Sequence, residues 1–407
     1  MKCGLLGRKL GHSYSPQIHA LLGNYSYQLF EKEPEEIGDF LKNGDFTGLN
    51  VTIPYKKEVI PFLDELSPAA ARLGAVNTIV RRDGKLIGHN TDYFGFRRLV
   101  QESGLQVAGK KVLVLGSGGA SSTAVAVLQE LGAKVTVISR SGENNYENLD
   151  RHADAAVIVN TTPVGMYPNT GKSALSLEGF PRLEGVLDAV YNPARTQILL
   201  DAEHRGLAAV NGLWMLVAQA KESAEWFTGE EIPDSRIAKI HHTLRLQMEN
   251  IILIGMPGCG KTAVGQQLAQ KLGKKFVDAD ESLEARVCRK ITDIIPNDGE
   301  AAFREMESET LAELGKQSGL VIATGGGCVT QPQNYPLLHQ NGTIFWLKRE
   351  LDKLPTDGRP LSQKGTLGKM YEARMPLYLR FADAAISNDG SIAETASAIC
   401  RKLEETT

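Results

Sequence analysis

The chain has 407 residues, of which 42% are hydrophobic and 23% are charged, and its formal net charge is −3. This length predicts two or three domains, and the near-neutral balance argues against nucleic-acid or membrane-surface binding, which requires a strongly basic face. The glycine-broken start does not fit a signal peptide, and no apolar run approaches the roughly 20 residues that span a bilayer. Five scattered cysteines without a Cys-x-x-Cys pair favour a cytoplasmic location over a disulfide framework or a zinc site.

Short apolar segments alternate with helical patterns throughout the chain. This alternation predicts an α/β fold with mainly parallel sheets in both halves. We find no internal repeat and no low-complexity segment.

Polar residues cluster in otherwise apolar surroundings along the first hundred residues. Together they are suited to binding a small polyhydroxylated acid through many hydrogen bonds. Each also has a simpler interpretation, because serines cap helices, asparagines hold turns and lysines lie on surfaces. The cluster comprises Ser13, Ser15, the run Asn50 to Lys56, Asn77, Thr78, and Asn90 to Asp92.

A dinucleotide site is predicted further along the chain. Lys111 to Leu115 reads as a buried strand, a glycine turn follows it, and a helix pattern leads to a second strand at Val135 to Ile138. Such a βαβ unit places the helix N-terminus and the glycine backbone against a pyrophosphate. The turn comprises Gly116, Ser117, Gly118, Gly119 and Ala120.

The second strand is followed by Ser139-Arg140-Ser141, where an acidic residue would otherwise hold a ribose hydroxyl. A guanidinium flanked by hydroxyls suits a 2′-phosphate, so NADP is favoured over NAD. The alternative is that Arg140 is a solvated loop cation.

The order of these motifs resembles the shikimate dehydrogenase family across about residues 3–225. The matching stretches are Gly11 to Pro16, Asn50 to Lys56, Ala75 to Thr78, Asn90 to Asp92, Gly116 to Ser121, Asn160 to Met166, Asp188 to Pro193, and Asn211 to Gln219.

This resemblance implies a two-lobed α/β enzyme with a Rossmann-like NADP domain that interconverts 3-dehydroshikimate and shikimate. It makes Lys56 and Asp92 the catalytic pair, which would supply a proton to the oxygen that becomes charged as hydride reaches the ketone carbon. It implies substrate contacts by Ser13, Ser15, Thr52, Asn77, Asp92, Tyr191 and Gln219. Gly212 would lie along the nucleotide, with the glycine turn, Ser139 and Arg140.

The chain departs from the family pattern around Arg140, where Ser139 and Ser141 replace the more usual Asn and Thr and the following segment is short. Only nineteen residues lie between Arg140 and Asn160, where the family usually has a further helix and strand. We therefore expect a reduced nucleotide domain on that side.

The junction between the halves is predicted to be helical. Pro233 to Glu249 carries Ile237, Ile240, Leu244 and Met248 at helical spacing, without a Gly/Ser tether. We expect a dehydrogenase-like region at 1–246 and a second region at 249–407. Within the first, a substrate lobe would comprise about 1–100 and 213–246, and an NADP lobe about 101–212.

Gly255-Met256-Pro257-Gly258-Cys259-Gly260-Lys261-Thr262 follows the apolar run Asn250 to Ile254. The spacing Gly, four residues, Gly-Lys-Thr between a strand and a helix predicts a phosphate-binding P-loop. Its backbone would bind ATP phosphates through Gly258, Cys259, Gly260 and Ala263. Lys261 would reach the β- and γ-phosphates, and Thr262 would ligate Mg²⁺.

Two carboxylates come next, in Phe276-Val277-Asp278-Ala279-Asp280. We interpret this as a short strand whose alternation turns Asp278 and Asp280 to one face near the P-loop. One of the two carboxylates would support Mg²⁺ through water, and the other would accept a substrate hydroxyl proton. A solvated acidic turn is the alternative.

Two arginines follow, Arg304 and Arg374, whose bidentate forks suit a carboxylate on the phosphate acceptor. Glu307 lies three residues after Arg304 on a predicted helix, where it would orient the guanidinium. The run Gly325 to Gly327 would let backbone approach a ligand closely.

This second set resembles the shikimate kinase family over about residues 250–400, with a parallel sheet like that of nucleoside-monophosphate kinases. The resemblance implies ATP-dependent phosphorylation of the shikimate 3-hydroxyl, with Lys261 and Asp280 catalytic. It assigns Asp280, Arg304, Gly326 and Arg374 to shikimate, and makes Arg359 a lid arginine near the transferring phosphate. Only eleven residues separate Leu347 from Arg359, so the segment before the lid is shortened and adenine contacts have no clear counterpart.

Both resemblances name the same molecule, so we expect a bifunctional shikimate-pathway enzyme that uses NADP(H), ATP and Mg²⁺. Its partners would be small-molecule substrates rather than nucleic acid or membrane, and it would be a monomer or homodimer. The alternatives are that one half is a non-catalytic regulatory module, or that the first half is a quinate/shikimate dehydrogenase.

Overall fold

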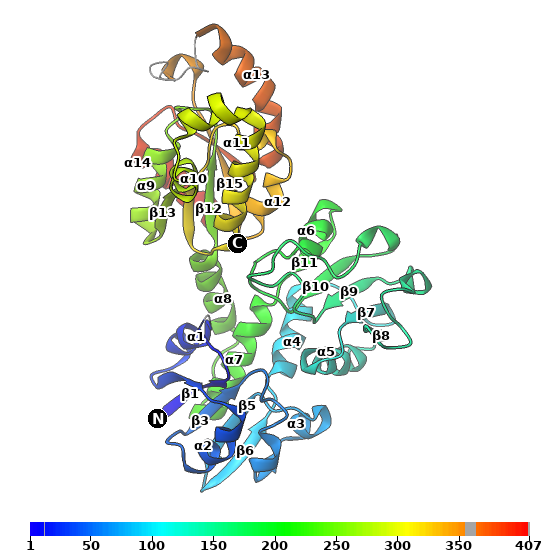
Figure 1. The fold of residues 1–407 in the computed structure, drawn as a ribbon. Helices are drawn as coiled ribbons and strands as arrows, with labels where there is room; N and C mark the ends of the chain where they lie inside the picture. The colour runs from blue at the N-terminus through cyan, green and yellow to red at the C-terminus, as the bar shows by residue number, and fades with distance from the viewer. Residues whose placement is uncertain (12, 355–363, 406–407) are drawn as a thin grey trace. The chain divides into compact units, whose positions relative to one another are not determined.

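The computed structural model describes residues 1–11, 13–354 and 364–405 (Figure 1). The described chain forms two compact units. Unit 1 contains Met1–Gly165, Lys172–Tyr191 and Ile198–Thr243, and unit 2 contains Met166–Gly171, Asn192–Gln197 and Leu244–Thr407. Both units are α/β, as the alternation of the sequence predicts.

The first sheet of unit 1 has six strands in the order β2-β1-β3-β5-β6-β4. Its first three strands run parallel, whereas β5 pairs antiparallel with both β3 and β6. Strand β4 also pairs parallel with β6, and the sheet is mixed because Asp83-Gly84, with positive φ at both positions, closes a two-residue antiparallel hairpin between β5 and β6. The strands are β1 (Lys2–Gly7), β2 (Ser26–Glu31), β3 (Gly48–Val51), β4 (Glu65–Leu66), β5 (Thr78–Arg82) and β6 (Lys85–His89); the helices of this lobe are α1 (Ser15–Leu22), α2 (Ile37–Asn43) and α3 (Pro68–Leu73).

The second sheet of unit 1 has five parallel strands in the order β11-β10-β9-β7-β8. The predicted βαβ unit is present as β7, α5 and β8. Between β8 and β9 the structure has a single 3₁₀ turn, η3 (Leu149–His152), which agrees with the expected reduction on this side. The elements are β7 (Lys111–Leu115), α5 (Gly119–Glu130), β8 (Lys134–Ile138), β9 (Val157–Asn160), β10 (Gly185–Asp188), α6 (Gln197–His204) and β11 (Ala208–Val210).

Two helices, α4 (Asp92–Glu102) and α7 (Leu213–Thr228), pack side by side and join the two sheets of unit 1 (Figure 1). Helix α7 also contacts α1, β3 and β5, and α4 also contacts α5. The pair therefore links the six-stranded sheet, through α7, to the helix α5 of the five-stranded sheet, through α4. The predicted helix at 233–249 is α8 (Ser235–Met248), and the division between the units falls inside it.

The sheet of unit 2 has five parallel strands in the order β13-β14-β12-β15-β16. Its central strands are buried on both faces by helices, so they read as continuous apolar runs such as Ile251–Ile254. The strands are β12 (Asn250–Ile254), β13 (Lys275–Asp278), β14 (Leu320–Ala323), β15 (Gly342–Lys348) and β16 (Ala384–Ser387). The helices are α9 (Lys261–Leu272), α10 (Ala279–Val287), α11 (Ile291–Lys316), α12 (Asn334–His339), α13 (Lys364–Phe381) and α14 (Ile392–Glu405). In the described residues, no helix is long and apolar enough to cross a membrane.

Candidate active sites

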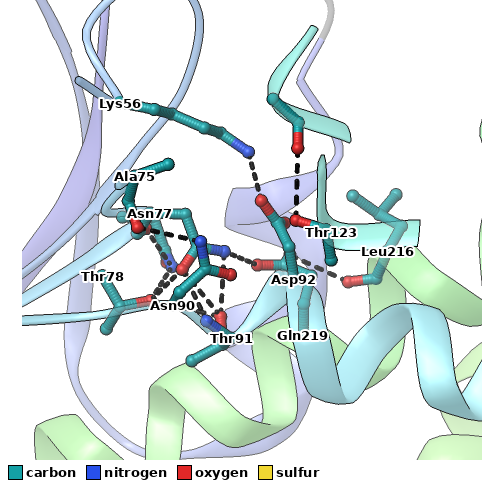
Figure 2. Close-up of polar contacts among 12 residues, drawn as sticks. Lys56, Ala75, Asn77, Thr78, Asn90, Thr91, Asp92, Thr123, Leu216 and Gln219 are labelled. Atoms are coloured by element: carbon teal, nitrogen blue, oxygen red, sulfur yellow. Dashed lines mark hydrogen bonds and ion pairs between the residues drawn. The ribbon is translucent and has the colours of Figure 1, made fainter. Parts of the chain in front are cut away.

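The predicted catalytic pair of unit 1 is assembled in the structure. Nζ of Lys56 donates to Oδ2 of Asp92 at 2.5 Å (Figure 2). Lys56 follows β3, and Asp92 is the first residue of α4, where the helix dipole favours a negative charge. The side chains are 26% and 12% exposed, so a small molecule can reach a largely desolvated ion pair.

Asn77 is fixed beside this pair by both ends of its amide. Its Oδ1 accepts from the backbone N–H of Thr91 at 2.7 Å, and its Nδ2 donates to Oγ1 of Thr91 at 3.0 Å and to Oε1 of Gln219 at 3.5 Å (Figure 2). Three segments that lie far apart in sequence therefore place Asn77, Gln219 and Asp92 together. Asn90, by contrast, holds a turn, because its Nδ2 donates to the carbonyl of Ala75 at 2.9 Å.

Ser223 is a buried polar residue beside this site that the sequence analysis did not single out. Its Oγ is fully buried and accepts from Nδ2 of Asn50 at 2.8 Å, and it lies 2.7 Å from Oγ1 of Thr78 and 3.0 Å from Oγ1 of Thr91. Tyr27 extends the network by donating to Oδ1 of Asn50 at 2.7 Å. Ser223 stands one helical turn after Gln219 on α7, and this spacing was the available signal.

The two serines near the N-terminus lie at the start of α1. The backbone N–H of Ser15 donates to Oγ of Ser13 at 3.2 Å, while the N-cap residue Tyr14 makes no side-chain capping bond. The ring of Tyr14 meets the ring of Tyr191 edge-on, with centroids 6.1 Å apart. Burial raises the pKa of Tyr191 to about 12, so its hydroxyl is a neutral donor at physiological pH. Thr52 is half-buried and follows β3 directly.

The glycine turn after β7 has open space above its backbone. A Cβ built on Gly118 or Gly119 would meet nothing within 4 Å, and Gly116 needs its positive φ of 107°. Gly118 is also the N-cap of α5, whose first turn contains Ala120. This arrangement is a cradle for a pyrophosphate at a helix N-terminus.

Arg140 is exposed after β8, and among the described residues its guanidinium makes no ion pair or hydrogen bond. Ser139 is half-buried beside it. Gly212 is the N-cap of α7, and a Cβ there would lie only 2.6 Å from the backbone carbon of Ala189. Close backbone packing therefore explains the glycine at 212 without any ligand.

In unit 2 the P-loop lies between β12 and α9 with its functional groups held in place. Nζ of Lys261 donates to the carbonyls of Gly255 and Met256 at 2.9 and 3.1 Å. Oγ1 of Thr262 donates to Oδ2 of Asp278 at 3.0 Å. Cys259 is buried, and Gly258 and Gly260 take positive φ values of 80° and 98°, which a side chain would strain.

The interpretation of Asp278 and Asp280 as alternating strand residues is wrong. Strand β13 ends at Asp278, which caps α10 by accepting from the backbone N–H groups of Asp280 and Glu281 at 3.0 and 3.4 Å. Asp280 therefore lies in the first turn of a helix. Burial, with the nearby carboxylates of Asp278 and Glu307, raises the pKa of Asp280 to about 6.

Arg304 and Glu307 form the predicted pair on α11, with Nη1 of Arg304 donating to Oε2 at 2.8 Å. A second donation goes from Nη2 to Oε1 of Glu300 at 3.0 Å. The Nε of Arg304 and the Oε1 of Glu307 are buried and have no hydrogen-bond partner among the described residues. These unpartnered groups fit a polar ligand at this point.

The three glycines after β14 are required by the side chains of the site itself. A Cβ on Gly325 would lie 2.6 Å from Oε1 of Glu307 and 2.8 Å from Oδ1 of Asp280, and one on Gly327 would collide with Arg304. A Cβ on Gly326 would lie 2.9 Å from the backbone nitrogen of the P-loop residue Pro257.

Arg374 reaches the same turn from α13. Its Nη1 donates to the Gly326 carbonyl at 3.2 Å, as the Tyr378 hydroxyl does at 2.6 Å. The two arginines predicted to hold a carboxylate thus converge on the glycine turn. Arg359 lies outside the described residues.

These features define the class of protein. A parallel sheet with an open glycine turn and a Lys–Asp pair is suited to nucleotide-linked oxidation and reduction. A P-loop beside a half-buried aspartate and two arginines is suited to phosphoryl transfer to a small acid. The chain is thus a two-domain enzyme that joins an oxidoreductase to a kinase.

Comparison with known proteins identifies both parts. Residues 5–79 match the model of the shikimate dehydrogenase substrate binding domain, and residues 257–404 match the model of shikimate kinase. The chain is 37% identical over 264 residues to the NADP⁺ shikimate dehydrogenase of Clostridium perfringens strain SM101, covering 60% of this chain and 97% of that protein.

Two solved structures show the same likeness for the first part. Shikimate dehydrogenase 1 of Peptoclostridium difficile is 38% identical with a TM-score of 0.56, covering 60% of this chain and 98% of that one. Quinate dehydrogenase of Corynebacterium glutamicum in complex with NAD is 28% identical with a TM-score of 0.55, covering 60% and 98%. The chain belongs to the shikimate dehydrogenase family, and its C-terminal part is a shikimate kinase domain.

Proposed function

We propose that unit 1 reduces 3-dehydroshikimate to shikimate with Lys56 and Asp92 as its catalytic pair. Hydride addition leaves negative charge on the former ketone oxygen, and that charge must be neutralised by a proton. The Lys56 ammonium is positioned to donate it, and the adjacent Asp92 carboxylate orients the lysine. The 2.5 Å contact between these side chains is the observation that carries this assignment.

The substrate would be held by the hydroxyl and amide groups around the pair. Asn77 and Gln219 are held in place by the network shown in Figure 2, so they would meet the substrate hydroxyls in a fixed orientation. Ser13, Ser15, Thr52 and Tyr191 would contact the remaining polar groups of the acid.

The residues that follow β7 and β8 fit NADPH, which supplies the hydride. The open backbone at Gly118 and Gly119 accommodates a pyrophosphate at the N-terminus of α5. The exposed Arg140 guanidinium suits the 2′-phosphate, with Ser139 beside it. Ser117 and Ala120 complete this cradle.

In unit 2 we propose that Asp280 accepts the proton of the shikimate 3-hydroxyl during phosphoryl transfer. Its raised pKa of about 6 makes it a better base than an ordinary aspartate while leaving it mostly ionised at neutral pH. Arg304 and Arg374 would hold the substrate carboxylate beside Gly326. The buried, unpartnered Nε of Arg304 supports this assignment.

The P-loop fits ATP, which supplies the transferred phosphoryl group. Gly258 to Ala263 would bind phosphate oxygens through backbone N–H groups, and Lys261 would neutralise their charge. Thr262 and Asp278 would hold Mg²⁺. In the part of the chain that the structure describes, no cluster of three His, Cys, Asp or Glu side chains could hold a metal alone, so the remaining ligands would be phosphate oxygens and water, as Mg²⁺ usually requires. Arg359 would act at the transferring phosphate.

A coupled assay tests both proposals on one preparation. Purified chain receives 3-dehydroshikimate, NADPH and ATP·Mg, and NADPH loss and ADP formation are followed separately. ADP formation should require NADPH unless shikimate is added directly. NADPH consumption with no ADP formed, even with added shikimate, would leave unit 2 as a binding module.

Quinate with NAD is the second candidate for unit 1, and the quinate dehydrogenase fold is similar. The unoccupied guanidinium of Arg140 favours NADP. Initial rates with NADPH and NADH, and with shikimate and quinate in the reverse direction, distinguish the two functions.

The five free cysteines support a reducing compartment such as the cytoplasm. We propose a monomer or homodimer with small-molecule partners alone.

A further inference from the structure

A cluster of buried hydroxyl groups adjoins Asn77 and Gln219 in unit 1, and no step of the proposed reaction uses it. The cluster consists of Ser223 on α7, Thr78 on β5 and Thr91 directly before α4, and each of the three is at most 1% exposed. Their hydroxyl oxygens lie 2.7 to 3.2 Å apart. Buried polar groups are costly unless each is bonded, so their arrangement needs a physical reason.

The hydrogen bonds of this cluster converge on Ser223. Burial raises the pKa of Tyr27 well above its ordinary value, so its hydroxyl keeps its proton and donates to Oδ1 of Asn50 at 2.7 Å. The amide of Asn50 must then present its Nδ2 to Oγ of Ser223, to which it donates at 2.8 Å. Ser223 in turn donates to the backbone carbonyl of Gln219 at 2.9 Å.

Thr91 connects Ser223 to Asn77. Oδ1 of Asn77 accepts from the backbone N–H of Thr91, so Nδ2 of Asn77 faces Oγ1 of Thr91 and donates to it at 3.0 Å (Figure 2). The proton of the Thr91 hydroxyl therefore needs an acceptor of its own. Oγ of Ser223, at 3.0 Å, is closer than the alternatives, Oγ1 of Thr78 and Oδ1 of Asn77, both at 3.2 Å.

Two observations indicate that these hydroxyls do more than fill the core. Thr91 is the N-cap residue of α4, where a threonine hydroxyl usually bonds to the first turn, yet it makes no side-chain capping bond. Phe227, one turn after Ser223 on α7, lies in an apolar cluster with Val80 of β5. Packing of this face of α7 on the sheet thus does not require a hydroxyl at position 223.

We propose that Ser223 is a positioning residue of the dehydrogenase site, which fixes the Asn77 amide through Thr91. This inference rests on the proposed function of unit 1. Without the Ser223 hydroxyl, Oγ1 of Thr91 would turn to the capping bond that it now forgoes, and Nδ2 of Asn77 would lose its acceptor. Because Asn77 is a proposed substrate contact and not the proton donor, the loss should appear in the KM for the substrate more than in kcat.

Steady-state kinetics of the full chain test the proposal. In Ser223→Ala the KM for 3-dehydroshikimate should rise about tenfold, with the KM for NADPH and the kinase turnover within about twofold of the original chain. The same change in an Asn77→Ala background should alter kcat/KM by less than about twofold, because Ser223 acts through Asn77. Thr228→Val is the matched control, since it removes a hydroxyl that bonds to the preceding turn of the same helix, and it should leave every kinetic constant within about twofold.

A pair of Thr91 variants keeps the test independent of how well Ser223→Ala folds. Thr91→Val keeps the shape of the side chain without its hydroxyl, and it should also raise the KM for 3-dehydroshikimate about tenfold. Thr91→Ser keeps the hydroxyl and should stay within about twofold of the original chain. Far-ultraviolet circular dichroism and urea midpoints show that each variant is folded.

An unchanged KM for 3-dehydroshikimate in folded Ser223→Ala would overturn the proposal. So would a tenfold loss of kcat/KM that persists in the Asn77→Ala background, because Ser223 would then act on the site as a whole and not through Asn77. Equal kinetics of Thr91→Val and Thr91→Ser would also contradict it. If the original chain itself does not reduce 3-dehydroshikimate, the proposed function of unit 1 fails, and this inference fails with it.

Discussion

Lys56 and Asp92 form an ion pair between the end of a β-strand segment and the first residue of a helix, with their side chains mostly withdrawn from water. The pair lies next to the amide of Asn77, whose orientation is fixed by hydrogen bonds to Thr91 (Figure 2). The proposed proton donor, its counter-charge and a hydrogen-bonding group thus lie close together. The arrangement belongs entirely to unit 1.

Substitution of Lys56 by Ala should therefore reduce dehydrogenase activity about 10²-fold or more, because no other group in the pair can donate a proton from the same place. Kinase turnover with added shikimate should be unchanged. Both rates are measured on the same purified variant, and the Lys57→Ala variant, which changes the adjacent exposed lysine, is the control. Loss of both activities in a folded Lys56→Ala protein would contradict separate sites.

The Asp280→Asn variant should lose kinase activity and gain stability. The pKa of Asp280 is raised to about 6 in the folded state from an ordinary value of 3.8, so the folded state holds this proton more tightly than the unfolded state. Its contribution to stability is therefore present below pH 4 and is lost as the pH rises through 6. Asparagine is never charged, and it should raise the free energy of unfolding at pH 7.5 by on the order of 3 kcal/mol, with little effect at pH 4.

Urea unfolding at the two pH values measures this difference. The fluorescence of Trp346 in a Trp214→Phe/Trp226→Phe background reports on unit 2, where Trp346 lies in β15. A stability difference that is the same at both pH values would show that Asp280 does not carry the shifted pKa.

His89 should make unit 1 sensitive to acid. It is 5% exposed, stacks on Trp226 with ring centroids 3.7 Å apart, and neither ring nitrogen has a hydrogen-bond partner among the described residues. Burial, with the nearby Arg82, lowers its pKa to about 4 from 6.5, so its contribution to stability is present above pH 6.5 and is lost as the pH falls toward 4.

The His89→Phe variant keeps the stacked ring and removes the titration. This substitution should raise the free energy of unfolding above that of the original chain, and the increase should be roughly 2 kcal/mol larger at pH 5 than at pH 7.5. Urea midpoints followed by far-ultraviolet circular dichroism at both pH values measure the gain. Equal midpoint shifts at pH 5 and 7.5 would mean that the histidine is not held neutral.

Gly118→Ala should weaken NADPH binding without destabilising the fold. Its φ of −86° is ordinary for any residue, and its Cβ would meet no protein atom within 4 Å, so the methyl group would occupy the proposed pyrophosphate space. We expect the KM for NADPH to rise about tenfold, with the KM for 3-dehydroshikimate nearly unchanged. Gly179→Ala, also in open space in the same lobe, is the control. Unchanged NADPH kinetics in Gly118→Ala would place the cofactor elsewhere.

The parts of this molecule that the sequence predicted well are those encoded locally. Strand β7, the glycine turn and the P-loop each follow from a short run of residues, because buried parallel strands are apolar and phosphate sites need bare backbone. The antiparallel hairpin at Asp83-Gly84 also had a local signal, because an Asp-Gly pair favours a two-residue hairpin turn. The sequence analysis did not predict this hairpin.

Other features could not be predicted locally. Asp278 was followed by Glu281 at helix-capping spacing, and the capping bonds that it makes outweigh continuation of the strand. Ser223 joins Asn50, Thr78 and Thr91 only once α7 has packed on β3 and β5, so its importance depends on tertiary structure. The glycines at 325 and 327 were predicted to admit a ligand, whereas the side chains of Glu307, Asp280 and Arg304 already fill the positions of their missing methyl groups.

The short connection between β8 and β9 has a consequence for how the protein behaves in concentrated solution. It leaves β8 at the border of its sheet, with Val135, Thr136 and Val137 only half-buried and one row of peptide groups facing outward. A strand of another molecule can pair with an exposed edge strand of this kind, and charged residues on the edge strand usually prevent that pairing. Lys134, exposed at the start of β8, is such a charged residue. Its replacement by an apolar residue should therefore favour aggregation without changing either proposed active site.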